Sequence, residues 1–486
     1  VDNIKSGAHM NSRLLTLTLI LTSLTAYGGN EREQSKRLYS SLTGGTANKA
    51  IADKYEEKLI SDGPLAAAEE IIESGQGFYS ATLRNFFSPT TNEDGSQFVD
   101  FNDMTATLIG MTRDSDGTTV YPGTSTKIRF FDVFYKNIMY QYDARDLSGR
   151  DSTAFTLVRE DVSKRNGWEM PVRFCASSSI KPGAEAVAAN CISREYARDE
   201  FKARDHIYFP EYGVAVPEYN RTKNYHHKKL QEFNLPYNRK DLFVNRGQVP
   251  YTTIYDDAVA GIFSTRAFAV AYYRGGTNRT PFKFFARNFL CLEMEQLNDT
   301  SIPDVYVRRD VDRKPGEVTD TFKNSCVGCH AGQDPIANAF SYYDYDGEAI
   351  DDGTMVYRDH KVMIDGSEEI VDGVAPKINL NNIYSQGRPV VNNSWINLWN
   401  RGQNKYIEWG SESSGNGAKS LGKMLSETKQ VRKCMTNKVF ESVCYKKAVS
   451  ELDKEVVSEY ANDFDKDANL KKLFAKIAVY CMGSNE

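Results

Sequence analysis

The sequence predicts a mainly α-helical protein of several parts, with loop-rich middle regions and few short strands. Apolar residues recur at helical spacing near both ends of the chain and again ahead of residue 326. Between residues 114 and 250, turn clusters such as "RDSDGT" separate short apolar runs, which favours long loops with a few strands. With 486 residues, 40% of them apolar, the chain is long enough to bury substantial cores.

The N-terminal part is expected to contain three helices. The stretches "NKAIADKYEEKLIS" at 48–61 and "PLAAAEEIIES" at 64–74 are amphipathic and rich in helix formers. Pro64 is at the predicted first position of its helix, where proline is tolerated. A further helix is predicted at 101–113, after a polar loop.

Helical spacing returns in the second half of the chain. Before residue 326 it predicts helices at 256–273 and 280–297. The chain then closes with three predicted helices, at 418–447, 453–464 and 469–482. These elements divide the mature chain into an N-terminal helical region at 31–113, a loop-rich region with short strands at 114–250, a central region at 251–416 and a C-terminal helical region at 417–486.

The first residues have the pattern of an export signal. We interpret residues 1–9 as a vector-derived extension and residues 10–26 as a signal peptide, because Arg13 precedes an apolar stretch that is too short to span a membrane comfortably. The following "LTAYGGN" resembles a bacterial lipoprotein signal with Tyr27 in the cysteine position. A lipid anchor is therefore expected if the natural protein has Cys at position 27, and ordinary secretion with cleavage after Ala26 is the alternative. Both alternatives place the protein in the periplasm or at the outer membrane.

Charge excludes one class of partner. The chain has 60 basic and 65 acidic residues, a formal charge of -5, and no long run of one sign. No electrostatic feature therefore favours nucleic-acid binding.

Export favours disulfides among the six cysteines outside the segment "CVGCH". Cys175 and Cys191 bracket a short loop and are expected to pair. Cys434 and Cys444 lie on one predicted helix, where ten residues span roughly 15 Å, so they cannot pair with each other. We expect them to tie this helix to Cys291 and Cys481.

The segment Cys326-Val-Gly-Cys329-His330 predicts one covalently attached haem c. In a helix, Cys329 follows Cys326 by roughly 300° of rotation and His330 follows by roughly 400°, so the three side chains project from one side. Two thiols can then join the vinyl groups at one porphyrin edge while the imidazole ligates the iron. Gly328 is expected to leave room for the macrocycle. A zinc knuckle, a redox dithiol, and a chance pattern or ordinary disulfide are the alternatives.

The same region resembles a known group of proteins. The stretches "GIFSTRAFAVAYYRGG", "SCVGCHAGQDPIANAFSYYDYDG" and "GNGAKSLGKMLSETKQVRKCM" are similar, in this order, to exported bacterial proteins with cytochrome-c-like domains of unknown function, which are related to planctomycete-type multidomain cytochromes. The resemblance covers most of residues 35–486. It implies a cytochrome-c-like haem region at 251–416 that binds haem through Cys326, Cys329 and His330, and it implies no particular reaction.

The second axial ligand of the iron has five candidates, because a six-coordinate haem usually takes a Met or a His there. Met355, His360 and Met363 follow the motif in a loop-rich stretch, and His226 and His227 precede it. An open distal position is the alternative.

The expected function is electron transfer, or a haem-dependent redox role within an envelope complex, with a redox protein or that complex as the partner. One alternative is a non-enzymatic envelope binding or scaffold lipoprotein, and a second is a peroxidase-like haem enzyme. Arginines near a haem often bind its propionates. Four arginines precede the motif in the two predicted helices and the loop between them: Arg266, Arg274, Arg279 and Arg287.

Overall fold

Helices predominate in the structure, a computed structural model, and the strands are three to five residues long. The mainly α-helical fold class is thus confirmed. The structure describes residues 30–74, 77–99, 102–121, 125–136, 140–142, 172–175, 243–245, 259–346, 354–358, 361–364, 367–370 and 373–483. The predicted export signal lies outside these residues, as does most of the 114–250 region. Among the described residues, no helix combines the length and apolar character that crossing a membrane requires.

Three of the five N-terminal helices lie at the expected positions, and the first and fourth were not predicted. The structure has α2 (Asn30–Thr43), α3 (Lys49–Asp62), α4 (Pro64–Ser74), α5 (Leu83–Phe87) and α6 (Asp103–Asp114). Pro64 is the first residue of α4, as predicted. Asn48 caps α3 by accepting a hydrogen bond from the Ile51 N–H at 3.0 Å, and Asn102 caps α6 in the same way through Thr105.

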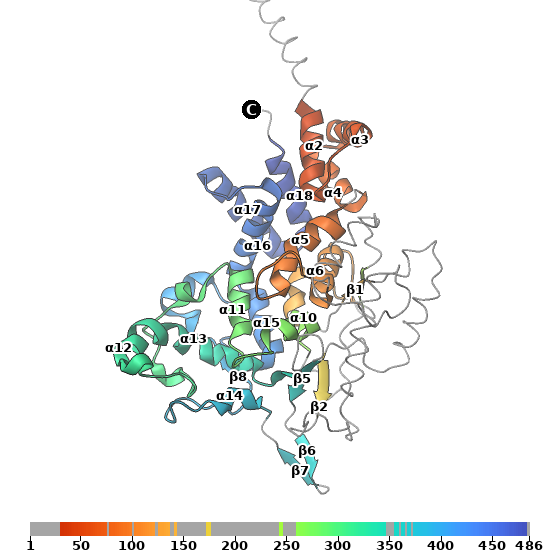
Figure 1. Cartoon of the computed structure of the whole chain (residues 1–486). Coiled ribbons are helices and arrows are strands. Elements are labelled where there is room, and N and C mark those ends of the chain that lie inside the picture. The colour runs from red at the N-terminus through yellow and green to blue at the C-terminus, as the bar shows by residue number, and fades with distance from the viewer. Residues whose placement is uncertain are drawn as a thin grey trace, which may run out of the picture.

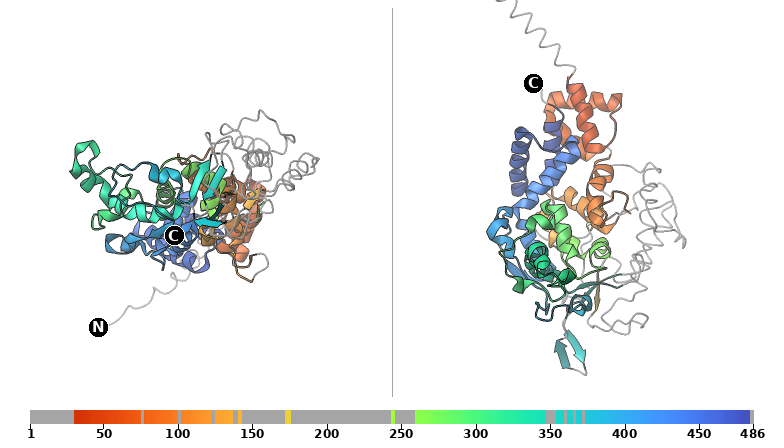
Figure 2. Two further views of the ribbon diagram at one scale, coloured as in Figure 1. Left: turned by 90° about the horizontal axis from the view of Figure 1, so that it is seen from below. Right: turned by 60° about the vertical axis from the view of Figure 1, so that its left-hand side comes forward.

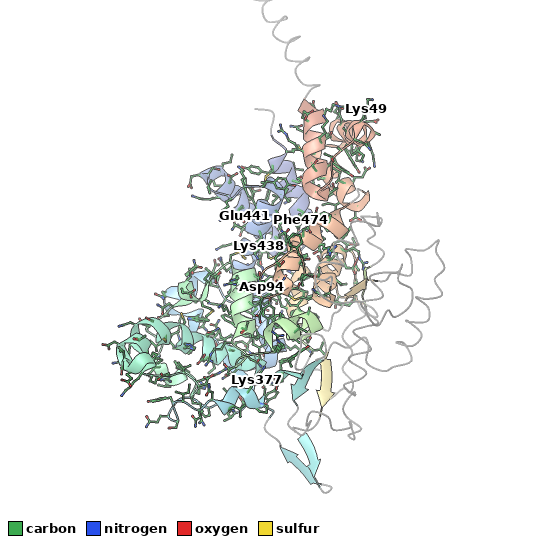
Figure 3. All side chains as sticks on the ribbon, in the orientation of Figure 1. Lys49, Asp94, Lys377, Lys438, Glu441 and Phe474 are labelled. Carbon is green, nitrogen blue, oxygen red and sulfur yellow. A yellow bond between two sulfur atoms is a disulfide. The ribbon has the colours of Figure 1, made fainter. Side chains whose placement is uncertain are left out.

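The two ends of the described chain pack against each other. The last helices are α15 (Gly417–Glu427), α16 (Lys429–Cys444), α17 (Glu451–Asp467) and α18 (Leu470–Cys481), and α18 lies beside α2 and α4 (Figure 1). Phe474 of α18 contacts the rings of Phe78 and Phe86 at centroid distances of 5.4 and 5.3 Å. Figure 3 shows Phe474 at this junction. Burial of these rings joins helices that are almost 400 residues apart in the sequence.

Aromatic side chains also build the middle of the molecule. The ring of Phe134 packs edge-on against the rings of Phe285 and Phe289, at centroid distances of 5.1 and 4.9 Å. Phe134 ends a short 3₁₀ helix (Phe130–Phe134) whose backbone contacts two glycines. A Cβ at Gly261 would overlap the Val133 carbonyl, and a Cβ at Gly422 would overlap the Phe134 carbonyl. The close backbone packing around this aromatic core therefore requires glycine at both positions.

Two predicted helices before the motif are shorter than expected. The helix predicted at 280–297 consists of α11 (Thr280–Phe285) and one π-helical turn, and it ends at Cys291, whose φ of 55° is left-handed. A disulfide from Cys291 to Cys434 holds this position, with the two Cα atoms 5.3 Å apart. Within residues 259–273, the helix predicted at 256–273 consists of a 3₁₀ turn and α10 (Arg266–Tyr272), because the extended Thr265 caps the start of α10.

The long helix predicted at 418–447 is also wrong, because it breaks between α15 and α16. Thr428, the residue at the break, has an extended backbone and is fully buried. Its hydroxyl accepts a hydrogen bond from the Gly410 N–H at 3.2 Å, and the next amide, that of Lys429, donates to the Glu408 carbonyl at 2.9 Å. The loop before α15 thus supplies the hydrogen bonds that would otherwise continue the helix.

Both disulfides in the described residues tie α16 to other segments. Cys434 bonds to Cys291, and Cys444 bonds to Cys481 at the end of α18. These are the partners expected from the sequence for Cys434 and Cys444. Cys175 lies in β2 (Val172–Cys175), and Cys191, its expected partner, lies outside the described residues.

The strands form small sheets, and Figure 1 shows most of the labelled ones in the lower part of the molecule. In the three-stranded sheet, β5 (Thr354–Arg358) lies between β2, to which it is parallel, and β4 (Tyr343–Asp346), to which it is antiparallel. The antiparallel pairs are β1 (Tyr140–Tyr142) with β3 (Phe243–Asn245), β6 (Lys361–Ile364) with β7 (Ser367–Ile370), and β8 (Ser394–Ile396) with β9 (Ser414–Asn416). The remaining helices, α12 (Thr319–Thr321), α13 (Val327–Ala337) and α14 (Pro376–Leu380), form a lobe below the terminal helices (Figures 1 and 2).

Candidate functional site

The "CVGCH" segment is helical, which is the conformation that the haem c interpretation assumes. Helix α12 runs through a π-helical turn ending at Cys326 into α13, which contains Cys329 and His330. All residues from Ala331 to Ala337 are buried, whereas Cys326, Cys329 and His330 are half-buried. Both cysteines are unpaired, although the other four described cysteines whose side chains are placed form disulfides. The motif therefore offers two thiols and an imidazole at the more exposed end of α13.

A buried carboxylate orients the imidazole. His330 Nδ1 lies 3.2 Å from Asp334 Oδ1, one helical turn further along α13, and Asp334 is fully buried. Burial by itself would raise the pKa of Asp334, but the charge of Arg279 and the hydrogen bond from His330 outweigh it and hold that pKa well below its ordinary value. Since the ionised carboxylate only accepts hydrogen bonds, Nδ1 is the ring nitrogen that donates to it, and Nε2 is the nitrogen left to bind another group.

Two arginines hold Asp334 in place. The Arg279 Nε donates to Asp334 Oδ1 at 2.6 Å, and the Arg308 backbone N–H donates to Oδ2 at 2.8 Å. Arg279 also binds both oxygens of Asp310, at 2.7 and 2.8 Å. The fully buried Arg308 guanidinium donates to Asn338 Oδ1 at 2.7 Å. Two guanidinium groups thus balance two carboxylates, which is how a charged cluster is accommodated inside a protein.

The arginines before the motif have different roles in the structure. Arg279 is committed to this cluster, so its charge is already paired within the protein. Arg287 pairs with Glu293 at 2.9 Å on the surface, and Arg274 is exposed. The side chain of Arg266 is not described.

The thiol environment bears on two of the alternative interpretations. Burial, followed by the nearby Glu295 charge, raises the pKa of Cys329, and its Sγ lies 3.3 Å from the Met294 carbonyl oxygen. A redox dithiol has a lowered thiol pKa instead, so this environment does not favour one. Within the described ranges, no three His, Cys, Asp or Glu side chains gather as a metal site would require, so a zinc knuckle is not assembled there.

The expectation that Gly328 leaves room for a macrocycle is wrong. A Cβ at Gly328 would overlap the Asn298 side chain, and the Gly328 carbonyl accepts a hydrogen bond from the Asp299 N–H at 2.9 Å. One turn later, a Cβ at Gly332 would overlap the indole of Trp399, which is fully buried. Both glycines serve close packing on the side of α13 away from His330.

We expect Gly332→Ala to lower the free energy of unfolding by about 1–3 kcal/mol, because the added methyl group cannot fit against the Trp399 ring. Chemical denaturation of the purified chain measures this change. Gly275→Ala is the matched control, since nothing lies within 4 Å of a Cβ at that exposed position. Equal stability of the two variants would contradict the close Gly332–Trp399 contact.

The distal-ligand candidates are not brought to His330 in the described residues. Met355 lies in β5, opposite Val172 and Tyr345, and Met363 lies in β6, opposite Glu368. Figure 1 shows β5 and the β6–β7 hairpin apart from α13. The three histidine candidates, His226, His227 and His360, lie outside the described residues.

The sequence offered one unused signal for this site. Asp334 follows His330 by four residues, a spacing that places both on one side of a helix. The remaining partners, Arg308, Asp310 and Asn338, come from other segments and have no local pattern that marks them.

Comparison with known proteins gives no match. No family model matches the chain, and no curated protein or solved structure does so at a significant level. Functional inference therefore rests on the site itself.

Proposed function

We propose that the chain is an exported c-type haem protein of the cell envelope whose role is electron transfer with a redox partner. Cys326 and Cys329 would bind the haem covalently, and His330 Nε2 would be the proximal iron ligand. Bound haem would supply a one-electron redox centre. The role of the protein residues is to attach, orient and tune that centre.

The observation that carries this proposal is the hydrogen bond between His330 and Asp334. A metal-binding histidine typically donates its second ring N–H to a carboxylate or carbonyl, which fixes its tautomer and increases its basicity. His330 has such a partner at 3.2 Å, and the carboxylate is fully buried and held by Arg279. Two unpaired thiols stand within four residues of this histidine, in a chain whose other placed cysteine side chains are paired. This donor set fits covalent haem better than it fits a reactive dithiol.

Production of the full chain in a bacterial strain with haem c maturation tests the proposal. We expect the protein to retain one haem after denaturing electrophoresis and to give the pyridine haemochrome spectrum of a c-type haem. The Cys326→Ala/Cys329→Ala double variant should lose covalent haem completely, because no thiol remains to form the thioether bonds. Ser325→Ala, an exposed neighbour of Cys326, is the matched control and should keep it.

Two results would contradict the proposal. The first is that this chain stays free of haem in a strain that matures an unrelated c-type cytochrome, which would contradict haem attachment. A haem-loaded protein with a high-spin iron that binds cyanide would remove the carrier role, because an electron carrier has both axial positions filled and does not respond to cyanide.

A further inference from the structure

A cavity of about 380 Å³ lies between the segments at 299–306 and 398–402. Asp299 lines it and donates its backbone N–H to the carbonyl of Gly328 in α13. Gly328 and His330 are roughly 160° apart around the helix. The cavity is therefore separate from the proposed haem site, and its volume falls in the range of about 300–1,000 Å³ that small-molecule sites occupy.

The Asp299 carboxylate has one oxygen bound and one free. Oδ1 accepts hydrogen bonds from the Ser301 N–H at 3.0 Å and from the Ser301 hydroxyl at 2.6 Å. Oδ2 accepts none from any described residue, although the side chain belongs to a residue that is only 4% exposed. A Cβ at Gly402, which also lines the cavity, would stand 3.1 Å from Oδ2. The free oxygen thus lies beside Gly402 at the cavity wall, where no donor of the described residues reaches it.

The other walls define the rest of a ligand. Ile302 and Leu398 are buried and give the cavity an apolar floor, and the ring of Tyr306 adds an aromatic wall. Arg401 is exposed at the rim. A ligand that matches these surfaces has a hydrogen-bond donor with positive charge at one end and an apolar body beside it.

We propose that this cavity binds a small organic ammonium compound with an apolar or aromatic body. The ammonium group donates to Asp299 Oδ2, and the body packs on Ile302 and Leu398. The Ser301 hydrogen bonds hold the carboxylate in the orientation that presents Oδ2, so the binding group is in place before the ligand arrives.

Calorimetric titration of the full chain with phenethylamine tests this proposal. Its neutral and anionic counterparts, 2-phenylethanol and 3-phenylpropionate, have nearly the same shape. We expect the amine to bind at least ~10-fold more tightly than either, because a hydrogen bond to a charged group contributes this much. Asp299→Asn should remove the ~10-fold preference while its amide oxygen still accepts from Ser301. Asp304→Asn, an exposed carboxylate five residues away that does not line the cavity, is the control and should bind like the wild type.

Equal affinity of the wild-type chain for the amine and the alcohol would overturn the proposal. Failure of all three probes to bind would overturn it as well. Solvent would then be the only donor to Oδ2. The comparison of the three probes on the wild-type chain decides the question even if Asp299→Asn fails to fold. It needs no haem, so its outcome is independent of the proposed function.

Discussion

Asp334→Asn should lower the free energy of unfolding by at least ~3 kcal/mol at neutral pH, since removal of one partner from a buried charge cluster leaves the other charge uncompensated. Asp334 is fully buried, and its two oxygens accept from Arg279, from the Arg308 backbone and from His330. In the variant, the NH₂ group of asparagine, which is itself a donor, would face donors that now bind one of the carboxylate oxygens. Urea denaturation measures the change, and Asp304→Asn, an exposed carboxylate on the same lobe, should alter stability by less than about 0.5 kcal/mol.

The same substitution changes the pH dependence of stability. The folded-state pKa of Asp334 is lowered below its unfolded value, so its contribution is fully present above about pH 4 and is lost as the pH falls through the folded-state pKa. Wild-type stability should therefore fall more steeply in acid than that of Asp334→Asn. Parallel pH profiles for the two proteins would contradict an ionised, stabilising Asp334.

Removal of the Cys291–Cys434 disulfide should have the largest effect on stability. The bond joins residues separated by 143 positions, and the loop-entropy relation gives about 5 kcal/mol for a loop of this length. The Cys291→Ser/Cys434→Ser double variant should therefore unfold at much lower denaturant concentration than the wild type under non-reducing conditions. The substitution should also release position 291 from its left-handed backbone conformation, at which the helix that begins with α11 now ends.

The second disulfide is the matched comparison. Cys444 and Cys481 are separated by 37 positions, and the same relation gives about 4 kcal/mol for Cys444→Ser/Cys481→Ser. A smaller loss from the Cys291–Cys434 pair than from the Cys444–Cys481 pair would contradict loop entropy as the source of the stabilisation. Mapping of disulfide-linked peptides in the wild-type chain checks that both bonds form.

The local sequence pattern correctly predicted the elements that depend on nearby residues. Helices α3, α4 and α6 appear where amphipathic spacing placed them, and Pro64 begins α4. The motif segment has the helical conformation that the haem interpretation assumed. Cys434 and Cys444 do not pair with each other, as helix geometry predicted, and they bond to the expected Cys291 and Cys481. Each of these features depends on residues within a few turns of each other, or on a distance that excludes a pairing.

Two of the wrong helix predictions share one physical cause, which is a contact with a distant segment. The predicted helix at 280–297 ends at Cys291, whose sulfur is bonded to Cys434, and the predicted helix at 418–447 breaks at Thr428, where the loop around Gly410 supplies hydrogen bonds. Helical spacing continues through both positions. Tertiary hydrogen bonds and a covalent bond override it.

For the candidate site, the sequence by itself determined the chemical groups: two thiols, an imidazole and their common helix. Only the tertiary structure decided how the imidazole is held. Asp334 lies four residues from His330, but the charges that keep it ionised come from Arg279, 55 residues earlier, and from the segment at Arg308. It also decided that Gly328 packs on Asn298 and that Asp299 faces a cavity. Helical phase follows from local sequence, whereas the packing of remote segments against that helix depends on the whole fold.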